Sequence, residues 1–264
     1  MAPRFDGARA FDYLVDQMDM GPRWPGSEGH TRVRQYIRET MTSLGWEVTA
    51  QSFEYQGFQA QNLIAKANIG KGPIIIVGAH YDTRRIADQS NTSVPVPGAV
   101  DGASGVAVLL ELGRSLDLNL VGNELWLVFF DIEDQGRGGM PGFDYAAGAA
   151  YMAENLTVEP EAMILVDMVG DADQQLYYEG NSDRALQQEL WALAANLGYG
   201  GVFIPQLRHT VIDDHVPFAR RGIPAVDIID FDYPYWHTTE DTIDKASPTS
   251  LLRVGRTLEV WLEG

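Results

Sequence analysis

The chain has 264 residues, of which 45% are hydrophobic, and 37 acidic against 19 basic residues give it a formal net charge of -18. This length and composition can cover a substantial core, and the acidic excess argues against nucleic acid and anionic membranes as partners. The sequence has no cysteine, which excludes disulfides, thiol catalysis and thiolate metal sites. Any metal must therefore bind carboxylates and some of the five histidines.

The N-terminus has no apolar segment typical of a signal peptide, and no window approaches the roughly 18 unbroken apolar residues of a transmembrane helix. We therefore expect a cytoplasmic protein, or a periplasmic or secreted one if a leader has been removed. No repeat, low-complexity tract or linker divides the sequence. One catalytic domain over residues 1–264 is the simplest interpretation.

The first part of the chain predicts two helices, over residues 6–20 and 31–44, followed by strands over 46–53 and 62–67. Ser27 is suited to cap the second helix, in which apolar residues recur at helical spacing before Gly45. His30 lies near the first turn of this helix, and we expect it at the surface.

The rest of the chain alternates short apolar segments with helical patterns. Strands are expected over 73–78, 125–130, 163–166 and 225–229, and helices over 102–116, 145–155, 182–197 and 247–262. Strands that are apolar on both faces are typical of an interior, parallel sheet. The sequence thus predicts a three-layer α/β sandwich whose mixed, mostly parallel central sheet is flanked by helices.

Polar residues follow each of these interior strands, and ligands of such sheets bind at the carboxyl ends of the strands. The first strand is followed by His80, the second by an acidic segment at 131–134, and the third by Asp167, while the fourth leads to His237. Asp101 stands at the start of a helix. Each acid alone could be a cap or turn residue. Their convergence on one edge favours a zinc site, although the helical H-E-x-x-H motif is absent.

Four segments carry a family resemblance: HYD at 80–82, PGAVDGASG at 97–105, FFDIED at 129–134 and WHT at 236–238. In this order they resemble the M28 zinc aminopeptidases and their relatives, the glutaminyl-peptide cyclotransferases. An earlier PGS at 25–27 belongs to the same pattern. The resemblance implies a zinc-peptidase-like fold and an enzyme that acts on peptide N-termini.

Residue by residue, the resemblance implies that Asp101, Asp134 and His237 bind a zinc ion. Glu133 matches the acid that serves as general base and acid in both branches. Asp134 departs from the pattern, because many members have Glu there. Asp is one methylene shorter, so the backbone must approach the metal more closely.

The two branches differ in the number of zinc ions. In the aminopeptidases a second zinc is bound by the residues matching His80 and Asp167, with Asp101 bridging both metals. In animal cyclases one zinc is used, and the acids matching Asp167 and Asp213 form a proton network with Glu133. The sequence therefore implies one zinc for a cyclase and two for an aminopeptidase.

Three further residues complete the implied site. Asp82 is expected to orient its neighbours from outside the metal ligands, and His215 to form a hydrogen bond there without touching metal. Trp236 matches an indole that walls the small substrate pocket of cyclases, although an ordinary aromatic at a pocket rim would also explain it.

The sequence favours the cyclase but leaves two alternatives open. The segments at 211–218 and 221–224 and the Trp236–His237 pair resemble glutaminyl cyclases. Against this, the loop at 135–139 lacks the aromatics of animal cyclases, and Ile212 replaces a Gln. A di-zinc aminopeptidase therefore remains open, as does an inactive family member with a binding role.

Overall fold

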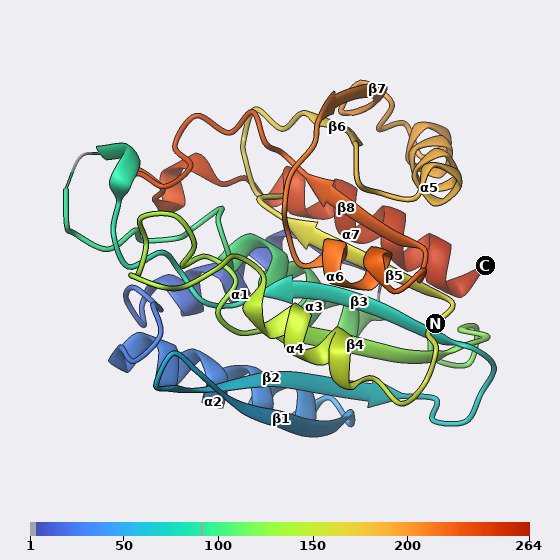
Figure 1. Cartoon of the computed structure of the whole chain (residues 1–264). Coiled ribbons are helices and arrows are strands. Elements are labelled where there is room, and N and C mark those ends of the chain that lie inside the picture. Colours follow the sequence, from blue (N-terminus) through green and yellow to red (C-terminus); the bar gives the residue numbers. More distant parts are fainter. Residues whose placement is uncertain (1–3, 91) are drawn as a thin grey trace.

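The computed structural model describes residues 4–90 and 92–264 (Figure 1). The chain begins with helices α1 (Gly7–Met18) and α2 (Glu28–Ser43), and the side chain of the preceding residue caps each of them. Asp6 Oδ1 accepts a 2.9 Å hydrogen bond from the Ala8 N–H, and Ser27 Oγ accepts a 3.0 Å bond from the His30 N–H. These contacts satisfy N–H groups that have no partner within the helix.

The centre of the molecule is a six-stranded mixed sheet in the order β1-β2-β4-β3-β5-β8. Its strands are β1 (Glu47–Tyr55), β2 (Phe58–Ala67), β3 (Ile74–His80), β4 (Glu124–Phe130), β5 (Ala162–Asp167) and β8 (Ala225–Ile229). The β1–β2 and β2–β4 pairs are antiparallel, whereas β4, β3, β5 and β8 pair in parallel. The mostly parallel sheet predicted from the apolar segments is confirmed.

Helices cover both faces of the sheet, which confirms the three layers (Figure 1). One face carries α1, α2, α3 (Ala103–Ser115), α5 (Arg184–Asn196) and α7 (Pro248–Glu263), and the other carries α4 (Ala147–Asn155) and α6 (His215–Arg220). Successive residues of β3 face opposite layers: Ile75 and Val77 join the larger apolar cluster and Ile76 the smaller one. Each such side chain contributes about 1.5–3 kcal/mol by leaving water.

A second, two-stranded parallel sheet pairs β6 (Leu176–Glu179) with β7 (Phe203–His209). The sequence did not predict it, because β6 is short and β7 contains Pro205 and is mostly exposed, so neither shows a clear alternation. Single turns of 3₁₀ helix lie at η1 (Asp88–Ser90) and η2 (Ile243–Lys245). Among the described residues, no helix is long and apolar enough to cross a lipid bilayer.

The carboxyl ends of the four parallel strands meet at one edge of the sheet, where the N-terminus of α3 also lies. Gly102 permits this approach: its φ is 98°, and a Cβ there would lie 2.8 Å from the Asp82 carbonyl oxygen. Asp101 is thereby brought beside the end of β3.

Candidate active site

Asp101, Asp134 and His237 form a first group of buried side chains at this edge. One ligand atom of each lies within 4.8 Å of the others. His237 Nε2 is 2.8 Å from Asp134 Oδ1 and 3.9 Å from Asp101 Oδ2. The three come from separate loops, before α3, after β4 and after β8, so only the fold brings them together.

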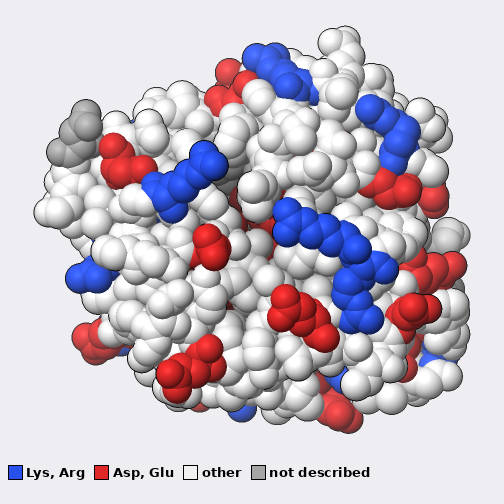
Figure 2. Space-filling model, in the orientation of Figure 1, with Lys and Arg blue, Asp and Glu red and all other residues white. Residues whose placement is uncertain are grey.

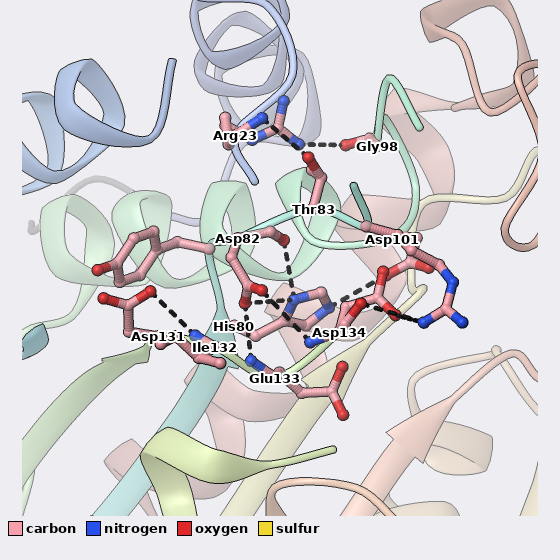
Figure 3. A network of polar contacts seen from close by, with 12 residues as sticks. Arg23, His80, Asp82, Thr83, Gly98, Asp101, Asp131, Ile132, Glu133 and Asp134 are labelled. Carbon is pink, nitrogen blue, oxygen red and sulfur yellow. Dashed lines mark hydrogen bonds and ion pairs between the residues drawn. The ribbon is translucent and has the colours of Figure 1, made fainter. Parts of the chain in front are cut away.

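His80, Asp101 and Asp167 form a second group that shares Asp101 with the first. His80 Nε2 lies 3.0 Å from Asp167 Oδ1. It also lies 3.2 Å from Asp101 Oδ1 (Figure 3). The Nδ1 atom of His80 is 3.1 Å from the Asp82 carbonyl oxygen, which can only accept a hydrogen bond. Nδ1 therefore carries a proton, and Nε2 faces the two carboxylates in the orientation of a metal ligand.

Both groups fit zinc, which binds imidazole nitrogen and carboxylate oxygen. In the described part of the chain, Asp101 Oδ2, Asp134 Oδ2 and His237 Nδ1 are buried without a hydrogen-bond partner. Burial raises the pKa of Asp134, although His237 opposes the rise. Burial also acts to raise the pKa of Asp101, but the hydrogen bond with His80 and the positive charges of His80, His237 and Arg84 together outweigh it, and the pKa is lowered. Unpaired carboxylate oxygens this close together favour a bound cation.

Glu133, Asp167 and Asp213 are three further buried carboxyls around one cavity. Burial, followed by the charge of Asp213, holds the pKa of Glu133 well above its usual range. Burial raises the pKa of Asp167 to about 7, against the opposing charge of His80, and it also raises the pKa of Asp213. Carboxyls whose pKa is raised from the usual range accept and release protons more readily near neutral pH, as a general acid and base requires.

The backbone before Glu133 is held in a strained conformation. Ile132 has φ 52°, which is a rare value for a β-branched residue. The Ile132 N–H donates to Asp131 Oδ1 at 2.9 Å, and the Glu133 N–H donates to Asp82 Oδ1 at 2.9 Å (Figure 3). Two buried carboxylates therefore fix the turn that presents Glu133 to the cavity.

The cavity has a volume of about 430 Å³ and lies on the face where Figure 2 shows acidic surface inside a hollow. This volume suits a small ligand or a single amino-acid residue. Trp236 lines it and stacks on His237, with ring centroids 3.6 Å apart at 22°. Ile212 lies at the same cavity and is 59% exposed.

The structure places the remaining histidines with acid partners. His215 is fully buried, and its Nε2 lies 3.0 Å from Glu179 Oε2. The surface position expected for His30 is wrong: it is 1% exposed, and its Nε2 lies 2.7 Å from Asp131 Oδ1. His30 lies on the same helix face as Val33 and the buried apolar residues that follow it. This spacing is the sequence signal that could have predicted a buried His30.

Sequence reasoning missed the neighbouring charged pair Arg84 and Asp88. The Arg84 side chain is fully buried, with Nε 2.7 Å from Asp88 Oδ1 and Nη1 3.3 Å from Asp134 Oδ1. The only sequence signal for this ion pair was its spacing of four residues, which is also common for pairs on the protein surface.

Known proteins resemble this chain over most of its length. The model of peptidase family M28 matches residues 62–262. The chain is similar to the glutaminyl-peptide cyclotransferase of Gloydius blomhoffii, with 30% identity over 93% of this chain and 79% of that protein.

Two solved structures share this fold. The fold is similar to that of Bacteroides thetaiotaomicron glutaminyl cyclase, with 30% identity and a TM-score of 0.93 over 100% of this chain and 99% of that one. It is also similar to a Zn-dependent exopeptidase from Parabacteroides distasonis, with 28% identity and a TM-score of 0.92 over 100% of both chains. The chain is therefore an enzyme that belongs to peptidase family M28.

Proposed function

We propose that this enzyme is a zinc-dependent glutaminyl-peptide cyclotransferase, which converts the N-terminal glutamine of a peptide to pyroglutamate and releases ammonia. The observation that carries the proposal is the group of buried carboxyls, Glu133, Asp167 and Asp213, that shares a cavity with Trp236. A hydrolase needs to activate water. A cyclase needs only to move one proton from the α-amine of the substrate glutamine to its side-chain amide nitrogen. Neighbouring carboxyls with raised pKa values suit that transfer, because they can accept a proton and release it again.

The pairing of the donor atoms favours one zinc at Asp101, Asp134 and His237. Asp101 Oδ2 and Asp134 Oδ2 have no hydrogen-bond partner among the described residues. In the second group the His80 imidazole already bridges Asp101 and Asp167, at 3.2 and 3.0 Å. When bound, zinc would act as a Lewis acid that polarises the side-chain amide carbonyl of the substrate.

The residues of the chain account for the proton movements. Glu133 accepts a proton as the substrate α-amine attacks its own side-chain carbonyl carbon, and a C–N bond closes the lactam ring. Glu133 then delivers this proton to the amide nitrogen, which leaves as ammonia when its C–N bond breaks. Asp213 helps to raise the pKa of Glu133, and Asp167 completes the proton network at the same cavity. Trp236 walls the pocket that holds the substrate glutamine in its reactive conformation.

A di-zinc aminopeptidase is the second candidate, because His80, Asp101 and Asp167 also place ligand atoms within 4.8 Å of one another. In that case Glu133 would deprotonate water for attack on the first peptide bond. The similarity to a Zn-dependent exopeptidase supports this alternative.

Zinc content and ammonia release test the proposal together. We expect protein purified without chelator to contain about one zinc per chain and to release ammonia from a peptide that begins with glutamine. Two zinc ions per chain without ammonia release would favour the aminopeptidase. Loss of all zinc on dialysis against a weak chelator would favour the inactive, binding protein.

A further inference from the structure

The loop that follows β3 carries Asp101 of the first group. It also contacts the two loops that carry the other members, Asp134 and His237. It supplies the buried Arg84 and the single turn η1, which begins at Asp88. Asp134 lies on the loop after β4 and His237 on the segment after β8. These three segments are far apart in the sequence, so the contacts among them determine the geometry of the metal group.

Arg84 binds the Asp134 side of the group through several atoms at once. Nη1 of Arg84 is 3.2 Å from the Asp134 carbonyl oxygen and 3.3 Å from Asp134 Oδ1. Nη2 donates a 2.9 Å hydrogen bond to the carbonyl oxygen of Arg137. One guanidinium thus holds the backbone and the side chain of the same ligand, which is the close backbone approach that an Asp in place of Glu requires.

Asp88 joins Arg84 to the His237 side of the group. Its carboxylate accepts hydrogen bonds from Arg84 Nε at 2.7 Å and from Arg84 Nη2 at 3.2 Å. Its Oδ1 lies 3.5 Å from His237 Nδ1, the nitrogen opposite the one that faces Asp134. In many metal sites a carboxylate on this second nitrogen orients the histidine ring.

The backbone of η1 holds the same histidine. The Gln89 N–H donates to the His237 carbonyl oxygen at 3.2 Å, and the Thr239 N–H donates to Ser90 Oγ at 3.0 Å. His237 has φ 57°, a conformation that needs such support in a residue other than glycine. Both ligands are therefore fixed from outside by one short loop.

We propose that Arg84 and Asp88 are positioning residues that hold Asp134 and His237 ready for zinc. The contacts form a closed ring, Arg84–Asp134–His237–Asp88, beside the metal group. The inference rests on zinc binding by this group and does not depend on whether the reaction is cyclisation or hydrolysis.

The direction in which zinc affinity changes when Arg84 is replaced distinguishes a positioning role from simple charge repulsion. Arg84 carries a positive charge beside a site for a divalent cation, so removing this charge alone would strengthen zinc binding. If Arg84 acts by holding the ligands, its removal weakens zinc binding instead. Substitution of an outer residue that orients a ligand lowers metal affinity by about 10- to 100-fold.

The experiment measures the zinc affinity of the folded full-length chain by competition with a chromophoric chelator, without any activity assay. We expect Arg84→Met and Asp88→Ala each to weaken zinc binding by about 10-fold or more. Asp88→Asn keeps an acceptor for Arg84 and should lose less zinc affinity than Asp88→Ala. Arg85→Met is the matched control, because Arg85 is exposed and packs over Trp24. It should bind zinc as the unmodified protein does.

Circular dichroism and the visible spectrum of the cobalt-substituted protein complete the test. If Arg84→Met does not fold, Arg84→Lys and the two Asp88 variants decide the question, since Lys keeps the charge but loses the bidentate fork. We expect the cobalt spectrum of folded variants to change, because the ligands shift. Unchanged or tighter zinc binding in folded Arg84 and Asp88 variants, with an unchanged cobalt spectrum, would overturn the proposal.

Discussion

Asp82 and Glu133 are joined by a hydrogen bond of 2.9 Å from the Glu133 N–H to Asp82 Oδ1. The Asp82 carboxylate also accepts bonds from the Asp134 N–H at 3.3 Å and from Gln135 Nε2 at 3.0 Å. Burial acts to raise the pKa of Asp82, but its interactions with His80 and the hydrogen bonds from Gln135 and Glu133 together outweigh it and lower the pKa. One carboxylate thus fixes Glu133, the proposed general base, and Asp134, the proposed metal ligand, relative to each other.

Asp82→Ala should therefore damage both stability and activity. It leaves the Glu133 and Asp134 N–H groups in the interior without an acceptor, whereas Gln135 Nε2 keeps its bond to the Thr83 carbonyl oxygen. Each unsatisfied buried group costs about 1–3 kcal/mol. We expect unfolding in urea to show a loss of about 3 kcal/mol or more, and kcat to fall in the folded fraction while KM changes less. Unaltered kcat would show that Asp82 does not aim Glu133.

Glu133→Gln should abolish turnover and leave zinc in place. Gln keeps the size of the side chain but cannot accept the proton, and general acid and base catalysis contributes about 10²- to 10⁴-fold. Ammonia release gives the rate, and metal analysis of the same sample gives the zinc content. A variant that retained most of the activity would remove Glu133 from its proposed role.

Trp236→Ala should act mainly on substrate binding. The indole lines the cavity, stacks on His237 and packs against Phe231 with ring centroids 5.4 Å apart. A contact with an aromatic ring contributes about 0.5–1.5 kcal/mol beyond area burial, so loss of the contact between the indole and the substrate should raise KM by about 2- to 10-fold. Trp236→Phe keeps part of the stacking surface and should raise KM less than Trp236→Ala. Steady-state kinetics of both variants measure this difference.

The ionisation of Glu179 should make the free energy of unfolding depend on pH in the acid range. Burial opposes ionisation of Glu179, but its interactions with His215 and the backbone N–H groups of Asn181 and Val211 together outweigh it and lower the pKa from 4.5 to about 2. A depressed pKa in the folded state means that the stabilisation is present above pH 4.5 and is lost as pH falls toward 2.

Glu179→Gln breaks this buried pair and should lower stability at pH 7 by about 3 kcal/mol. The difference between the variant and the unmodified protein should shrink below pH 4.5, where Glu179 would begin to gain a proton in the unfolded chain. Denaturant unfolding at a series of pH values measures this difference. A difference that stays constant down to pH 3 would contradict the lowered pKa.

The interior strands and the residues that follow them were predictable because their signals are local. A segment apolar on both faces, such as the one that became β3, is typical of a parallel sheet, and a polar residue at its end marks the binding edge. The grouping of Asp101, Asp134 and His237 required the family resemblance as well, since their spacing along the chain has no regular period.

The contacts that support the site were not predictable, because each depends on where a distant loop lies. Arg84 and Asp88 have the spacing of an exposed helical pair, yet both belong to a loop beside the metal group. His30 was misassigned for the opposite reason: its polar side chain suggested the surface, whereas its partner Asp131 lies 101 positions away in the sequence. Burial of a charged pair is decided by tertiary packing.

Mass spectrometry of a peptide with N-terminal glutamine tests the central claim most directly. The zinc-loaded enzyme should yield a peptide that has lost ammonia while its chain remains intact, and Glu133→Gln should leave the substrate unchanged. Release of free glutamine together with a peptide one residue shorter would contradict the cyclase and establish hydrolysis of the first peptide bond.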